Sequence, residues 1–142
     1  MKDTTRAWLQ YAESDLLIAK TLLNTLLEES SVHLAPGILF HSQQVVEKCF
    51  KALLVEAGKS IPKIHSIIKL YELLPPEAQQ AICITENEKE NFDDIYIDVR
   101  YPGEQGLLPH AFPSMTRAKE MFATAERVIQ DVFRYLNIPP SE

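Results

Sequence analysis

The sequence predicts an all-α fold, namely an antiparallel up-and-down four-helix bundle with one or two additional short helices. Apolar residues recur at three-and-four spacing through three long stretches, as they do on the buried faces of helices. Proline and glycine interrupt the chain between these stretches, and no segment has a candidate strand partner. The 142 residues suit a single domain, 1–142, that is large enough to bury a substantial core.

The first predicted helix begins at a capping segment, Asp3-Thr4-Thr5, and runs to about Glu28. Its candidate seam residues alternate at four and three positions, and they are Trp8, Ala12, Asp15, Ala19, Leu22 and Leu26. Asp15 is the exception among them, because a carboxylate in a helix seam is unfavourable unless it is paired.

The second predicted helix, 38–57, carries the most specific pattern in the chain, and we expect the other helices to pack around it. Pro36 and Gly37 precede it and Gly58 follows it, which is typical of a helix start and a helix C-cap. Its apolar stripe comprises Ile38, Leu39, Val45, Val46, Cys49, Phe50, Leu53, Leu54 and Ala57. Its remaining face consists of polar side chains, which are Gln43, Gln44, Glu47, Lys48 and Lys51.

The rest of the chain predicts further helices of different lengths. Two short helices are predicted at 64–74 and from Pro76 to about Ile84. The segment 92–100 fits either a helix or a strand by its pattern, and the helices on both sides favour a helix. A loop rich in proline and glycine follows, and Ser114 then caps the last helix, which runs to about Leu136.

The composition excludes several classes of function. The chain has 20 acidic and 14 basic residues and a formal net charge of −6, which argues against broad non-specific nucleic-acid binding but leaves room for a small basic pocket. Cys49 and Cys83 form no CxxC pair and the histidines lack metal-ligand spacing, so we expect neither a metal nor a cofactor. No apolar run reaches the roughly 18 residues of a membrane span, and no signal-peptide core is present, so we expect a cytoplasmic protein without membrane contact.

One group of polar residues connects the first two predicted helices. Asp15 with Glu47, Lys48 and Lys51 is either an ion-pair network that fixes the register of the helices or the lining of a pocket between them. A Glu47–Lys51 pair at i,i+4 would contribute only about 0.3 kcal/mol if it were exposed to solvent.

A second group follows the segment 92–100. Arg100 either stabilises the C-terminal end of its helix or binds a phosphate beside the flexible loop, where Tyr101 could stack on a base. His65 and His110 are further candidates, although a lone histidine is more often structural or solvated than catalytic.

Four segments, in order along the chain, resemble motifs of the HEPN domain family (higher eukaryote and prokaryote nucleotide-binding). Segment 41–54, HSQQVVEKCFKALL, resembles the QQxxEKxxKAL signature of that family. Segments 12–16 (AESDL), 62–67 (PKIHSI) and 98–103 (DVRYPG) resemble its A-x-x-D-L, P-x-x-H-(D/S)-L and RYP segments. The resemblance implies a bundle that forms a homodimer and that pairs with a minimal nucleotidyltransferase protein in a toxin–antitoxin-like module.

The resemblance also implies a chemistry, because active members of the family are metal-independent ribonucleases that use an Arg-x(4–6)-His pair from both subunits. The histidine would move the proton of the attacking 2′-hydroxyl, and the arginine would hold the scissile phosphate. In this chain the positions four to seven after Arg100 are 104–107, with the sequence EQGL, and the nearest downstream histidine is His110. The usual pair is therefore absent at the usual spacing.

The leading hypothesis is a HEPN-type module that dimerises and binds a nucleotide, RNA or a minimal nucleotidyltransferase partner without the usual catalytic pair. Its ligand-binding residues would be Arg100, Tyr101, His65, Lys48 and Lys51. One alternative is a ribonuclease toxin that uses Arg100 with His110 or His65. The other is a structural interaction bundle, in which Asp15, Gln44 and Glu47 only specify the packing.

Overall fold

The computed structural model describes residues 1–100 and 112–139 of the chain, with side chains for 1–95 and 112–139. In this part of the chain every regular element is a helix, which confirms the predicted all-α class. The elements are α1 (Asp3–Glu29), the 3₁₀ turn η1 (Val32–Leu34), α2 (Ala35–Glu56), α3 (Ile67–Leu73), α4 (Pro76–Ala81), α5 (Glu86–Arg100) and α6 (Met115–Tyr135).

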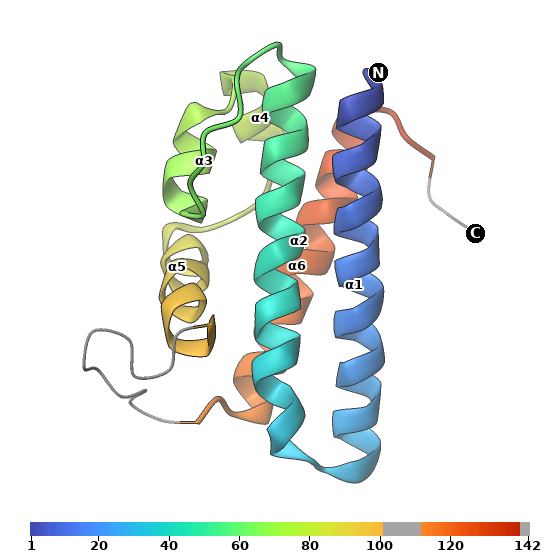
Figure 1. Cartoon of the computed structure of the whole chain (residues 1–142), viewed down its shortest axis with the longest axis vertical. Helices are drawn as coiled ribbons and strands as arrows, with labels where there is room; N and C mark the ends of the chain where they lie inside the picture. The colour runs from blue at the N-terminus through green and yellow to red at the C-terminus, as the bar shows by residue number, and fades with distance from the viewer. Residues whose placement is uncertain (101–111, 140–142) are drawn as a thin grey trace.

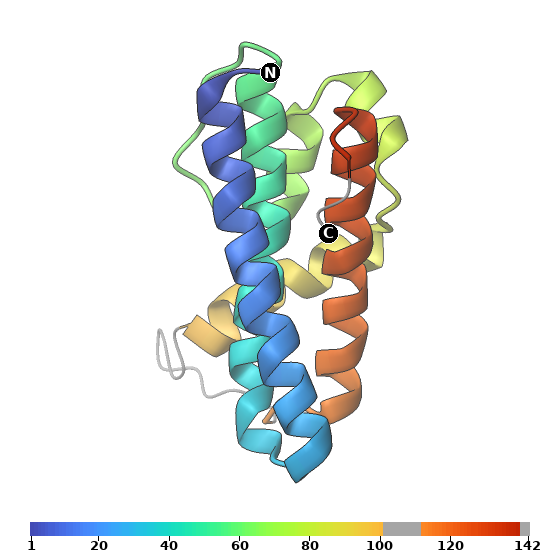
Figure 2. The same cartoon turned by 90° about the vertical axis from the view of Figure 1, so that its right-hand side faces the viewer.

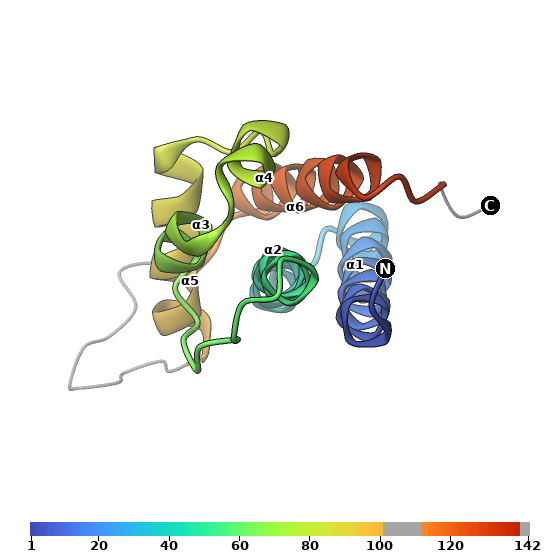
Figure 3. The same ribbon diagram turned by 90° about the horizontal axis from the view of Figure 1, so that it is seen from above.

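Three long helices, α1, α2 and α6, lie side by side along the molecule (Figure 1). The helix α1 runs antiparallel to α2, whereas α2 and α6 run in the same direction (Figures 1 and 2). The helix α5 crosses them obliquely on the side of α2 opposite α1, and α3 lies above it (Figures 2 and 3). Viewed from above, α2 therefore lies between α1 and the α3–α5 side, and it contacts α1, α3, α5 and α6.

The second helix is buried on more of its surface than its sequence predicts. Its apolar stripe is buried as predicted, apart from Ala57, which is exposed. Three members of its polar face, Gln43, Glu47 and Lys51, are buried as well, with at most 6% of their surface exposed. The prediction that other helices pack around this one is confirmed, and the consequence is a core that contains charged groups.

Two predicted helix starts are wrong for local reasons. The first helix begins at Asp3 with Lys2 at the N-cap position and no side-chain cap, so the predicted cap is not formed. Thr5 is instead fully buried, and its hydroxyl donates to Glu56 Oε1 at 2.9 Å. The second helix begins at Ala35, because Pro36 occupies its first turn, where a missing N–H costs nothing.

Several later boundaries also differ. The third helix begins at Ile67 and not at residue 64, because Ser66 is extended and its hydroxyl accepts from Lys69 N at 3.2 Å as an N-cap. The fifth begins at Glu86, six residues before the predicted start, because Thr85 and Glu88 form a reciprocal capping box. Ser114 caps α6 as predicted, and Gly58 at φ 76° ends α2 in the left-handed conformation.

Candidate polar site on the second helix

Two nearly buried carboxylates, Asp15 of α1 and Glu47 of α2, are the centres of two polar clusters. Asp15 is 6% exposed and Glu47 is 4% exposed. Each carboxylate contacts one lysine ammonium and one histidine ring nitrogen. Because Lys48 follows Glu47 directly in α2, the two clusters are neighbours along the same helix.

The Asp15 cluster joins α1 to α2. Lys48 Nζ donates to Asp15 Oδ2, and His41 Nδ1 lies 2.8 Å from Asp15 Oδ1. The Lys48 ammonium also lies 5.8 Å from the ring centroid of Tyr11, which is within cation–π range. Asp15 is therefore paired, as its position in the seam requires. The contact from His41 has no counterpart among the predicted contacts.

The Glu47 cluster lies deeper. Lys51 Nζ donates to Glu47 Oε2 at 3.1 Å, and the side chain of Lys51 is only 8% exposed. Gln43 Nε2 donates to Glu47 Oε1 at 3.1 Å. His65 Nδ1 lies 3.2 Å from Glu47 Oε2, and the Trp8 ring centroid lies 5.7 Å from the Lys51 ammonium. The Glu47–Lys51 pair is therefore a buried ion pair, in which desolvation and Coulomb attraction are both large.

The two adjacent glutamines have different roles. Gln43 is fully buried and also donates, at 3.4 Å, to the backbone carbonyl of His65. Gln44 is half-buried and donates to Gln43 Oε1 at 2.7 Å. The sequence identified Gln44 as a structural polar residue, but Gln43 is the side chain that bonds directly to Glu47.

The residues His65 and Ser66 connect α2 to α5. His65 contacts Glu47 in α2, whereas the next residue, Ser66, donates its hydroxyl to Asp93 Oδ2 in α5 at 2.7 Å. Asp93 Oδ1 also accepts from the backbone N–H of Ile67 at 2.6 Å, at the first residue of α3. The sequence did not identify Asp93 as a site residue. It lies in a helix with several acidic residues, and their pattern does not show which carboxylate bonds to another helix and which ones face solvent.

Among the lysines and histidines of the two clusters, His65 is the most accessible, since 51% of its side chain is exposed. A carboxylate hydrogen-bonded to Nδ1 holds the orientation of an imidazole, and the partner of one ring nitrogen sets the tautomer. Lys48 is 21% exposed and His41 is 25% exposed, so both reach the surface at the rim of the Asp15 cluster.

The structure brings together six of the predicted site residues, which are Asp15, Gln44, Glu47, Lys48, Lys51 and His65. Arg100 is the last residue of α5, and its side chain is not among those described. Tyr101 and His110 lie outside the described residues, so the composite pair with Arg100 stays a prediction.

Other titratable groups serve the packing of the helices. Burial by itself would raise the pKa of Glu88, but hydrogen bonds from Arg127, the Thr85 N–H and Thr124 outweigh it and lower the pKa to about 2. This carboxylate thereby fixes the start of α5 against α6. Burial also raises the pKa of the Cys49 thiol, which fits its predicted role as a small apolar core residue.

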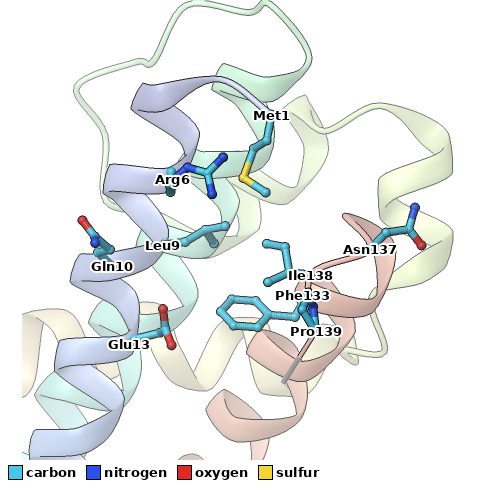
Figure 4. A pocket seen from close by; sticks show the side chains of 9 residues that line it. All are labelled: Met1, Arg6, Leu9, Gln10, Glu13, Phe133, Asn137, Ile138 and Pro139. Carbon is cyan, nitrogen blue, oxygen red and sulfur yellow. The ribbon is translucent and has the colours of Figure 1, made fainter. Parts of the chain in front are cut away.

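A separate pocket of about 370 Å³ lies between the N-terminal part of α1 and the end of α6 with the residues that follow it (Figure 4). Its apolar part includes Leu9, Phe133 and Ile138, and Arg6 and Glu13 lie on the α1 side. None of the residues of the two polar clusters lines this pocket.

Within residues 1–95 and 112–139, no group of three or more potential ligands is arranged to hold a metal ion. No helix of the described chain is both long and apolar enough to cross a membrane.

Comparisons with known proteins agree with this architecture. A search of curated proteins finds no match to the chain. Among solved structures, the chain is similar to the protein TT1696 from Thermus thermophilus, with a TM-score of 0.69 and 24% sequence identity over 94% of this chain and 98% of that chain. At this identity the similarity shows the fold alone. The sequence model of the HEPN domain matches residues 5–135, which is nearly the whole chain, and the protein therefore belongs to the HEPN family.

Proposed function

We propose that this protein binds an anionic nucleotide or RNA segment at the surface between His65 and the end of α5. The observation that carries the proposal is the His65–Glu47 contact, because a half-exposed imidazole held by a buried carboxylate has a fixed orientation toward a ligand. In the same proposal the protein is a cytoplasmic homodimer that pairs with a minimal nucleotidyltransferase, and α1, α2, α5 and α6 are the members of its four-helix bundle.

The connection between His65 and α5 supports this location. Ser66 and Asp93 tie the His65 segment to α5, and Arg100 is the last residue of that helix. In the proposal, the Arg100 guanidinium binds a phosphate and Tyr101 stacks on a base. Lys48 adds positive potential from the rim, whereas Lys51 acts through Glu47, whose carboxylate already holds its ammonium.

Calorimetric titration with ATP, GTP and a short RNA tests the proposal. We expect binding by the wild type, loss of binding in Arg100→Ala, and weaker binding in His65→Ala. The control is His33→Ala, since His33 is an exposed histidine whose ring contacts Phe112 and belongs to neither cluster. Absence of binding by the wild type, or unchanged binding by Arg100→Ala, contradicts the assignment.

A metal-independent ribonuclease is the second candidate, and the same contact favours it. An imidazole that is held at Nδ1 by a carboxylate can accept, at Nε2, the proton of an attacking 2′-hydroxyl. Arg100 would stabilise the charge on the phosphate, and His110 is the alternative base. Induced expression in a bacterium distinguishes the candidates: growth inhibition should disappear in His65→Ala if His65 is the base. Toxicity that persists in the His65→Ala/His110→Ala double variant would exclude both histidines.

A further inference from the structure

The two adjacent glutamines of α2 form a chain of side-chain amides that begins at the buried Glu47 carboxylate. Gln43 Nε2 donates to Glu47 Oε1 at 3.1 Å and to the backbone carbonyl of His65 at 3.4 Å. Gln44 Nε2 in turn donates to Gln43 Oε1 at 2.7 Å. The connection from α2 to α3, which carries His65, curves round α2 on the side away from α6 (Figure 3). The chain of amides therefore leads from a fully buried side chain, Gln43, to a half-buried one, Gln44.

These bonds determine which way each amide faces. A carboxylate that is paired with a lysine ammonium and a backbone carbonyl can only accept, so the NH₂ group of Gln43 must face Glu47 and its Oε1 must face away from it. That oxygen also can only accept, so the NH₂ group of Gln44 must face it. Turning the Gln44 amide over would bring two amide oxygens together with no proton between them. The buried Glu47 carboxylate thus sets the orientation of the Gln44 amide through Gln43.

The consequence is a hydrogen-bond acceptor of fixed position at the surface of α2. Among the described residues, no donor is bonded to Gln44 Oε1. Lys48 lies one turn further along α2, and its ammonium reaches the surface, as do the imidazoles of His41 and His65. These three groups can bind phosphate oxygens, whereas an amide oxygen cannot, because it has no proton to donate. A ligand that covers Gln44 must therefore present a donor to Oε1.

We propose that Gln44 is a specificity-determining residue of the ligand site, whose Oε1 accepts a hydrogen bond from the exocyclic amino group of a bound adenine. The proposal rests on the nucleotide site proposed above and adds its base preference. In that site Arg100 binds a phosphate and Tyr101 stacks on the face of a base, so the edge of the base is the part that these two residues leave unread. Glutamine matches the edge of adenine, because its oxygen accepts from the amino group while its remaining N–H donates to the neighbouring ring nitrogen.

The fixed orientation of the amide is what makes this contact selective. Hypoxanthine carries a carbonyl where adenine carries the amino group, so it presents an acceptor to Gln44 Oε1. A glutamine that rotates freely would turn over and donate to that carbonyl, and it would discriminate little between the two bases. Gln44 cannot turn over without opposing the oxygen of Gln43. We therefore expect adenine to be preferred over hypoxanthine by roughly fivefold to a hundredfold, the range for one well-matched pair of a side chain and a base.

Calorimetric titration of the full chain with ATP and with inosine triphosphate tests the preference. We expect the wild type to bind ATP more tightly by that factor. Gln44→Met should weaken the binding of ATP until the two nucleotides bind equally, since the oxygen that distinguishes them is removed. Gln43→Met should also reduce the preference, but by strengthening the binding of inosine triphosphate, because the Gln44 amide is then free to turn over. Far-UV circular dichroism should show that both variants are folded, and Gln44→Met, at a half-buried position, tests the proposal even if the buried Gln43→Met does not fold.

Gln130→Met is the matched control, because Gln130 is an exposed glutamine of α6, and it should leave the preference unchanged. Equal binding of the two nucleotides by the wild type, or a preference that Gln44→Met retains, overturns the proposal and leaves the nucleotide site itself standing. A preference that a folded Gln43→Met retains in full refutes the fixing of the Gln44 amide by Gln43. A wild type that binds neither nucleotide overturns both this proposal and the nucleotide site on which it rests.

Discussion

The buried Glu47–Lys51 pair gives the sharpest stability prediction. Replacing Glu47 by Leu leaves the Lys51 ammonium, which is 8% exposed, without the carboxylate that holds it. Breaking a buried pair in this way costs about 3–5 kcal/mol, because an uncompensated charge stays in the core. For a chain of this length, that loss corresponds to a fall in Tm of roughly 6–20 °C.

Urea denaturation followed by far-UV circular dichroism measures this loss. The Glu47→Leu/Lys51→Met double variant should recover most of it, since both charges leave together. Arg134→Met is the control, because Arg134 is 75% exposed and its pair with Asp131 should contribute no more than about 1 kcal/mol. The reasoning is refuted if Glu47→Leu costs no more than Arg134→Met, or if the double variant loses the sum of the two single variants.

Three further predictions concern separate contacts. The carboxyl of Glu88 has a pKa of about 2 in the folded protein against an ordinary value of 4.5, so as the pH falls the unfolded chain takes up the proton first, and the free energy of unfolding decreases between pH of about 4.5 and about 2. In Glu88→Gln, denaturation curves should show a smaller decrease of the free energy of unfolding over this pH range, and a decrease equal to that of the wild type contradicts the prediction. Asp93→Ala should lower the free energy of unfolding by about 0.5–2 kcal/mol and speed hydrogen exchange at the Ile67 amide, which loses the carboxylate that accepts its hydrogen bond. Unchanged exchange at this amide would argue that Asp93 does not stabilise the start of α3. Gly58→Ala should lower the free energy of unfolding by about 1–2 kcal/mol, because the alanine would have to adopt a positive φ. Steric clash is not the cause, since the nearest atom, Lys2 Nζ, is 3.7 Å from the added Cβ. A thermal melt equal to that of the wild type would show that this strain is absent.

The sequence predicts the long helices well because their periodicity extends over many turns. It fails where one or two side-chain contacts decide the boundary. The start of α5 depends on the capping box of Thr85 and Glu88, which lies inside an acidic run that is typical of a solvated loop. The start of α3 depends on Asp93, which is 27 residues away from Ser66 in sequence.

The candidate site is predictable to the same extent. Asp15 needs a partner because it lies in an apolar seam, and Lys48 is found there. The burial of Glu47 and Lys51 cannot be predicted, because an i,i+4 pair has the same pattern on an exposed helix and on a buried one. Burial here depends on the segment of His65 passing over α2, which is a tertiary contact with no local signal in the sequence.

The Asp15 cluster has a consequence for how the chain folds. The α1 seam includes Ala12 and Ala19, which are fully buried and too small to interlock strongly with another helix. Sliding α1 along α2 by one turn, about 5.4 Å, would keep much of that apolar contact but would separate Asp15 from both His41 and Lys48. We expect such a misaligned arrangement to be disfavoured, since the buried Asp15 carboxylate would have no partner in it, and the cluster thus selects one alignment of the two helices.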